Sequence, residues 1–95
     1  MKLIIKPSNI KEKKYTAIFY DGDRKVKTTH FGSKGMSDFT KHKDPERKKR
    51  YLARHRKNEN WNDMYSAGAL SRWILWGETT LTKSIASFKK RFNLT

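Results

Sequence analysis

The alternation of hydrophobic and polar residues predicts strands in the first third of the chain. Residues 15–20 (YTAIFY) place rings or branched side chains on both faces, which is typical of a central strand. The tripeptide 21–23 (DGD) is a strong hairpin signal. Residues 25–31 (KVKTTHF) are therefore expected to return antiparallel. The β-branched run at 2–6 (KLIIK) predicts one further short strand.

After residue 44 the apolar residues recur at spacings of three and four, which predicts helices. The first predicted helix covers about 44–58 (DPERKKRYLARHRKN). Asp44 can accept a hydrogen bond from a free amide of its first turn, and Pro45 suits that turn because its missing N–H has no helical partner there. A second helix is expected over about 66–76, ending at Gly77. Within it, the predicted buried face consists of Ala67, Leu70, Ile74 and Trp73.

A third helix is predicted over about 81–92, with Thr80 as its cap. Its apolar stripe consists of Leu81, Ile85, Phe88 and Phe92. Strands followed by helices predict an α+β fold: a small N-terminal antiparallel sheet of about three strands, then about three helices packed on one face. With 95 residues, the chain is expected to form a single basic domain, 1–95.

The composition indicates a small hydrophobic core and a large positive charge. Only 35% of the residues are hydrophobic and 13% are aromatic, so rings must supply much of the core. The formal net charge is +14, which makes a polyanionic partner plausible. There is no cysteine, which excludes a disulfide framework and a cysteine-based zinc site. No run is long enough to span a bilayer, and Lys6 and Pro7 interrupt the apolar start, so we expect no transmembrane segment and no signal peptide.

The charge is concentrated on the helix predicted over 44–58. Tyr51, Leu52 and His55 give it only a narrow apolar stripe, so most of its circumference should face water or an anion. We interpret it as a helix that faces a polyanion; an ordinary solvated helix face is the alternative. The expected function is non-enzymatic nucleic-acid binding through phosphate contacts, with DNA favoured and no cofactor. The predicted contacts are Lys34, Lys41, Lys43, Arg47, Lys48, Arg50, Arg54, Arg56, Lys57, Lys89, Lys90 and Arg91.

Two further roles on nucleic acid are weaker hypotheses. Tyr20 and Trp61 are candidates for stacking on single-stranded bases. A helical face formed by Arg50, Arg54 and Asn58 is a candidate for reading bases in a groove, although contacts to phosphate or solvent are the simpler interpretation.

An enzyme is the alternative class. A histidine beside carboxylates and arginines is the minimum for a metal-assisted nuclease. The candidates are His30, His42, His55, Asp38, Asp44, Glu46 and Asn58. His42 and His55 flank a predicted helix of about 15–20 Å, too far apart to share a metal ion. Asp44 is better explained as a cap and His55 as part of the docking stripe, so we predict no catalytic residue and no metal site.

Most of the chain also shows a resemblance to a known family. The resembling runs are HFGSKGMSDFTKHKD (30–44), ERKKRYLARHRKNENWND (46–63), SAGALSRWILWG (66–77) and SIASFKKRFNL (84–94). They resemble small, basic, uncharacterised proteins of giant algal and amoebal DNA viruses, the nucleocytoplasmic large DNA viruses. This resemblance implies a viral protein, made late or packaged with the particle, but transfers no residue's role. Met36 and Phe39 stand where the family pattern has tyrosine, which argues against a catalytic tyrosine at either position.

The resemblance places the expected nucleic-acid binding in viral genome packaging or compaction. The protein is then expected in the virion or the infected host cell, in the nucleus or viral factory, and not secreted. The alternative is a small structural virion protein, a capsid-associated cement or minor capsid protein. Its basic surface would bind acidic protein or membrane faces, with capsid proteins as partners.

Overall fold

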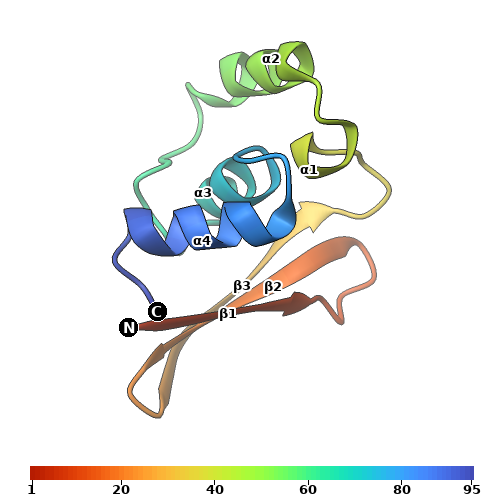
Figure 1. The fold of residues 1–95 in the computed structure, drawn as a ribbon. Helices are drawn as coiled ribbons and strands as arrows, with labels where there is room; N and C mark the ends of the chain where they lie inside the picture. Colours follow the sequence, from red (N-terminus) through yellow and green to blue (C-terminus); the bar gives the residue numbers. More distant parts are fainter.

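An antiparallel sheet of three strands forms one layer of the molecule (Figure 1). The computed structural model describes residues 1–95. The strands are β1 (Lys2–Pro7), β2 (Lys13–Asp21) and β3 (Arg24–Ser33), in the order β1-β2-β3. The central position of β2 confirms the prediction from its two apolar faces. Gly22 lies in the β2–β3 turn with a φ of 62°, a conformation that glycine adopts without steric cost.

The helices all lie on one side of the sheet (Figure 1), so the predicted α+β class is confirmed. They are α1 (Phe39–His42), α2 (Pro45–His55), α3 (Ala67–Leu70), the π-helical turn η1 (Ser71–Leu75) and α4 (Leu81–Arg91). Helix α2 is the farthest from the sheet, whereas α3 and α4 lie close to it. None of the helices has the length and apolar character needed to cross a membrane.

The predicted helix starts are correct, because each depends on a local capping residue. The Asp44 carboxylate accepts a hydrogen bond from the Glu46 amide at 3.0 Å, and α2 begins at Pro45. The Thr80 hydroxyl likewise accepts from the Lys83 amide at 3.2 Å, where α4 begins. Helix α2 ends at His55, three residues before the predicted end.

The middle helices differ more from the prediction. Helix α1 was not predicted; Asp38 caps its start, and Lys43 ends it after one turn with a left-handed φ of 55°. The predicted second helix splits into α3 and η1. In η1 the Trp76 amide bonds to the Ser71 carbonyl, five residues earlier, at 3.0 Å. Ala67 is exposed rather than buried, whereas Leu70 and Ile74 are buried as predicted.

The core lies between the helices and one face of the sheet. Leu3, Phe19 and Phe31 of the sheet are buried with Leu70 and Phe88 of the helices. The remaining residues of the predicted α4 stripe, Leu81, Ile85 and Phe92, pack against this cluster. The two chain ends lie side by side (Figure 1), where the Leu3 amide donates to the Thr95 carbonyl at 2.9 Å and the Thr95 amide to the Met1 carbonyl at 3.0 Å. These bonds help to satisfy the outer edge of β1.

Close packing of β3 against η1 depends on Gly32. Its φ is 80°, and a Cβ at this position would lie 2.8 Å from Leu75 Cδ1, closer than real Cβ contacts. The absence of a side chain therefore allows the strand and the π-helical turn to approach each other. This contact also forms one side of the cavity described below.

No helix covers the opposite face of the sheet (Figure 1). Ile4 lies on this face and is 37% exposed, opposite Ile18 of β2. His30 bonds there through Nδ1 to the hydroxyls of Ser8 and Thr16, at 2.9 and 2.8 Å. This face is therefore mixed in character, with apolar and hydrogen-bonding side chains next to one another.

Substitutions on the two faces of the sheet should have very different costs. Phe19 is fully buried, with its ring 4.8 Å from that of Tyr65 in an edge arrangement. Phe19→Ala should lower the free energy of unfolding by about 3–5 kcal/mol, because it leaves a cavity. Ile4→Ala, on the uncovered face, should cost about 1 kcal/mol or less. Urea unfolding measures both, and equal costs would contradict the packing of helices on the Phe19 face.

Candidate functional site

Helix α2 is attached to the rest of the protein through a stack of rings. One face of the Tyr51 ring lies against Trp76, with centroids 4.3 Å apart and an interplanar angle of 6°. The other face lies against His55, at 4.2 Å and 26°. We call Trp76, Tyr51 and His55 the aromatic stack. Tyr51 is buried, and Leu52 and His55 are half-buried, which confirms the narrow docking stripe expected from the sequence.

One basic side chain of α2 and one of η1 bond to backbone carbonyls just after η1. The Lys48 ammonium donates to the Gly77 carbonyl at 2.6 Å and lies 4.7 Å from the centre of the Phe39 ring. The Arg72 guanidinium donates to the Trp76 carbonyl at 3.3 Å. Both carbonyls lie just after η1, where the aligned peptide dipoles favour positive charge. The chain thus uses Lys48 to connect α2 to the segment after η1, and Arg72 to bond a carbonyl at the end of its own helical turn.

The surroundings of these two cations disfavour their charged forms. Burial lowers the pKa of Lys48, and the nearby Arg72 lowers it further. Burial also lowers the pKa of Arg72, with a further contribution from Arg91. Lys48 was one of the predicted phosphate contacts, but its ammonium already has a partner inside the protein. Sequence reasoning missed the structural role of Arg72, because no local pattern shows which cation points inward.

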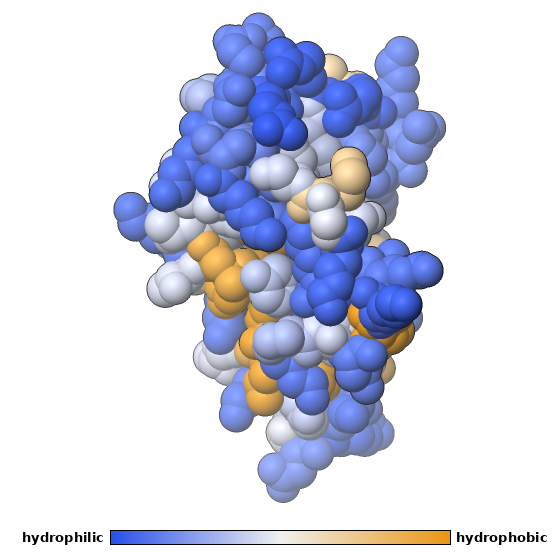
Figure 2. Space-filling model, turned by 90° about the vertical axis from the view of Figure 1, so that its right-hand side faces the viewer, coloured by the Kyte–Doolittle hydropathy of each residue, from blue (hydrophilic) through white to orange (hydrophobic).

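Most of the other predicted contacts are exposed on or beside α2. This group comprises Lys41, Lys43, Arg47, Arg50, Arg54, Arg56 and Lys57. Figure 2 shows the end of the molecule formed by α2 as an almost continuous hydrophilic surface. Lys34 is exposed in the loop before α1. We call these eight residues the basic surface.

The second predicted patch lies on a different element. Lys90 and Arg91 are exposed and Lys89 is half-buried, all in the last turn of α4. The Arg91 guanidinium lies 3.6 Å from the centre of the Trp73 ring, a cation–π contact. The structure therefore does not merge this patch with α2 into one helical surface.

The basic surface has almost no internal compensation by acidic residues. Of the 23 Lys and Arg side chains, only Lys14 forms an ion pair with a carboxylate, that of Asp38 at 2.6 Å. Both partners of that pair are buried within the fold. Glu59 has other partners, since it accepts from the Trp61 indole at 2.9 Å and bonds to His55 at 3.1 Å. The surface cations are therefore left to interact with solvent or an external anion.

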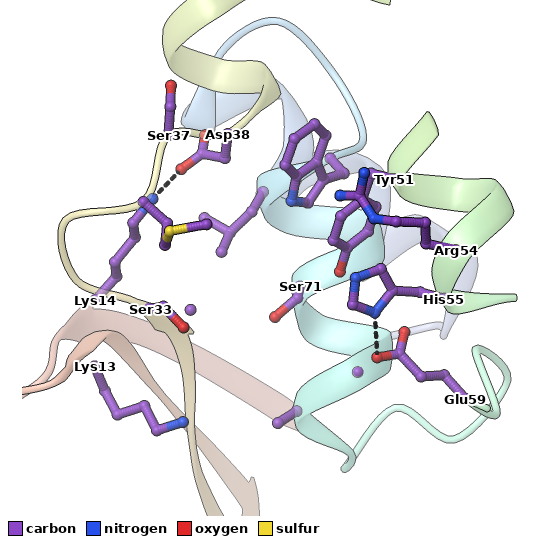
Figure 3. Close-up of a pocket in the computed structure, with 16 residues that line it drawn as sticks. Lys13, Lys14, Ser33, Ser37, Asp38, Tyr51, Arg54, His55, Glu59 and Ser71 are labelled. Atoms are coloured by element: carbon purple, nitrogen blue, oxygen red, sulfur yellow. Dashed lines mark hydrogen bonds and ion pairs between the residues drawn. The ribbon is translucent and has the colours of Figure 1, made fainter. Parts of the chain in front are cut away.

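A cavity of about 310 Å³ lies between the ends of β2 and β3, helix α2 and the α3–η1 segment. Figure 3 shows Lys13 and Ser33 on the sheet side and Tyr51, Arg54 and His55 on the α2 side. No pattern in the sequence predicts this cavity. No spacing relates its lining residues, which are brought together only by the packing of four separate segments.

The candidate catalytic and stacking residues are dispersed or already in contact with other groups. No three His, Asp or Glu side chains gather closely enough to hold a metal ion. His42 lies beyond Trp76, at 5.2 Å between ring centres, so two rings separate it from His55. Asp44 caps α2, as predicted. Of the predicted stacking residues, Trp61 has the Arg72 guanidinium 5.3 Å from its ring centre, and Tyr20 is half-buried near the β2–β3 turn.

The buried position of Tyr51 should make stability fall at alkaline pH. Burial raises the pKa of its phenol, with a further contribution from Glu59. The native state then favours the protonated form, so its stabilisation is complete below the ordinary pKa of about 10 and is lost as the pH rises above it. The loss should approach about 1.4 kcal/mol per pH unit.

The variant Tyr51→Phe tests this dependence, because it keeps the ring and removes the ionisable group. Urea unfolding at several values between pH 7 and 11 should show wild type losing stability relative to the variant above about pH 10. At pH 7 the two proteins should unfold at similar denaturant concentrations. Parallel pH profiles throughout would contradict the burial of the phenol.

Comparison with known proteins identifies a family but no activity. No curated protein and no solved structure matches the chain. A family model described as a family of unknown function, DUF5754, matches residues 3–55, which is more than half of the chain. The matched region includes the sheet except Lys2, all of α1 and α2, and with them most of the basic surface. The chain thus belongs to the family of unknown function DUF5754.

Proposed function

We propose that the protein binds nucleic acid through phosphate contacts, without catalysis and largely without regard to sequence. One observation carries this proposal: exposed cations without carboxylate partners are concentrated on and beside α2. When Lys and Arg neutralise phosphates, condensed counterions are released, and the entropy gain favours binding to any sequence. Arginine adds paired hydrogen bonds to phosphate oxygens, and four residues of the basic surface are arginines.

The length of α2 suits a nucleic-acid backbone. Arg47, Arg50 and Arg54 recur at spacings of three and four and so share one side of the helix. From Arg47 to Arg54 the helix rises by about 10 Å. One strand of B-form DNA presents about three phosphates over that axial length. Three arginines could therefore each contact a separate phosphate, and we favour DNA as the target.

The residues on α4 support the proposal less strongly. Lys89, Lys90 and Arg91 belong to the last turn of α4, where positive charge already stabilises the helix dipole. We assign them a secondary role, as contacts for a strand that extends beyond α2. Lys48 is omitted from the interface because the Gly77 carbonyl holds its ammonium.

Binding that does not depend on nucleotide sequence is suited to the packaging or compaction of a genome. The resemblance to small basic proteins of giant DNA viruses supports the viral genome as the target. On this proposal the protein acts in the virion or in the nucleus or viral factory of the infected cell.

A second candidate is a small structural virion protein that binds acidic faces of capsid proteins. The uncovered face of the sheet favours this role, because Ile4 is 37% exposed there between Lys2 and Lys6 on the same strand. An apolar side chain flanked by cations can contribute to a protein interface. The two candidates predict different binding surfaces, the outer side of α2 and the uncovered sheet face.

Charge reversals at matched positions distinguish these surfaces. Arg47→Glu/Arg50→Glu alters two exposed residues of α2, and Lys2→Glu/Lys6→Glu alters two exposed residues of β1 on the uncovered face of the sheet. Both double variants change the net charge equally. The α2 variant should weaken binding to every DNA sequence alike and flatten the log–log salt slope by roughly two, because two phosphate contacts are lost.

The β1 variant should bind DNA much more like wild type, with a smaller change in slope. Fluorescence anisotropy at several salt concentrations measures both variants, and circular dichroism confirms that each remains folded. Equal weakening by the two variants would show that net charge alone causes the binding. Selective weakening by the β1 variant would move the interface to the uncovered face of the sheet.

A further inference from the structure

The cavity beside the aromatic stack contains hydroxyl groups that have no partner in the protein. No hydrogen bond within the fold involves the side-chain hydroxyl of Tyr51, Ser71 or Ser33. In Figure 3 the Tyr51 and Ser71 hydroxyls point into the cavity from the helical side, and Ser33 lies on the opposite side. Ser33 is exposed and Ser71 is half-buried, so both hydroxyls are accessible from outside the protein. A group that enters the cavity would therefore find several free donors.

The charge of the cavity favours an anionic ligand. Its two carboxylates already have partners: Asp38 pairs with Lys14 and caps α1, and Glu59 bonds to His55 and Trp61. Lys13 and Arg54 also line the cavity, and neither forms an ion pair. Figure 3 shows them on opposite sides. Two free cations and the hydroxyl donors together match the requirements of a phosphate group.

The aromatic stack offers a surface for a planar group. Tyr51 has a ring on each face, so it has no face left for a ligand. His55 ends the stack and lines the cavity, with its side chain 39% exposed. A nucleobase could stack on the remaining face of this imidazole.

The remaining wall is built from an uncommon backbone element. Ser71 and Leu75 belong to the π-helical turn η1, and Trp76 follows it directly. Single π-helical turns are rare, and they occur frequently at functional sites. Here the turn contributes one free hydroxyl and the apolar side chain of Leu75 to the same cavity, and Trp76 adds a second apolar side chain.

We propose that this cavity binds one nucleotide unit, a nucleoside phosphate monoester. Arg54 would contact the phosphate, the charge of Lys13 on the opposite side of the cavity would add longer-range attraction, Tyr51 and Ser71 would donate hydrogen bonds, and His55 would stack on the base. A volume of about 310 Å³ fits a small ligand, because pockets for small molecules begin at about 300 Å³. The proposal goes beyond phosphate-backbone binding, since this concave site shares only Arg54 with the basic surface.

The test uses adenosine 5′-monophosphate as the probe, with adenosine and inorganic phosphate as partial ligands. Calorimetry should show saturable binding of the monophosphate and weaker binding of either part alone. Tyr51→Phe should reduce the affinity roughly tenfold, because it removes one hydrogen bond to a charged group and keeps the stack. Ser71→Ala should also reduce it. The matched control Tyr20→Phe removes a hydroxyl outside the cavity and should leave the affinity unchanged.

Amide shifts in NMR spectra should map the monophosphate to residues around Ser33, Tyr51 and Ser71. Two results would overturn the proposal: no saturable binding of either the monophosphate or a short single strand, or binding that Tyr51→Phe and Tyr20→Phe affect equally. A short single-stranded DNA tests whether the cavity binds a nucleotide within a nucleic-acid chain rather than a free monophosphate. If Tyr51→Phe weakens only the strand, the cavity takes a nucleotide that belongs to a chain.

The α2 double variant Arg47→Glu/Arg50→Glu, which alters no residue of the cavity, separates this proposal from the proposed function. It should weaken duplex DNA binding and preserve binding of the monophosphate. Monophosphate binding without duplex binding in wild type would leave the cavity proposal standing and reject the phosphate-backbone role. If wild type binds duplex DNA but Tyr51→Phe changes the affinity for neither the monophosphate nor the single strand, the cavity proposal is rejected and the proposed function stands.

Discussion

The burial of Tyr51 between Trp76 and His55 is the interaction on which the rest of the structure depends. Helix α2 has few apolar residues, so it cannot form a broad hydrophobic interface with the core. A flat ring with partners on both faces concentrates much contact area into one residue. Because the attachment is narrow, most of the circumference of α2 remains available to charged side chains.

The same attachment divides the cations into two groups with different roles. Lys48 joins α2 to the Gly77 carbonyl just after η1, and Arg72 bonds within its own segment to the Trp76 carbonyl. The cations on the outer side of α2 have no such partner. The cavity lies on the inner side of α2, since Tyr51 and His55 line it. One helix therefore contributes an outer convex surface and one wall of an inner concave site.

Features that depend on neighbouring residues in the sequence were predictable. Alternation identified β2 as the central strand, and the caps Asp44 and Thr80 correctly placed the starts of α2 and α4. Helix α1 was not predicted because it is a single turn, which is too short to show a periodic pattern of apolar residues. The π-helical turn was not predicted because its defining bond, from Trp76 to Ser71, has no signature in residue type.

Prediction of the candidate sites from the sequence was limited in the same way. The basic helix was evident from charge, and its docking stripe followed from Tyr51, Leu52 and His55. The inward direction of Lys48 was not evident, because it depends on a carbonyl 29 residues away. The cavity requires Ser33, Tyr51 and Ser71 to meet, and only tertiary packing brings them together. Local patterns therefore predict the elements, whereas contacts between distant residues determine the sites.

The central claim is that the outer side of α2 binds nucleic acid rather than any polyanion. The most direct measurement is a salt titration of binding to short duplex DNA, single-stranded DNA and RNA, with heparin as the control polyanion. We predict that at least one nucleic-acid form binds clearly more tightly than heparin, with a steep salt slope that reflects several phosphate contacts. Equal, weak binding to all four, lost at physiological salt, would contradict the claim.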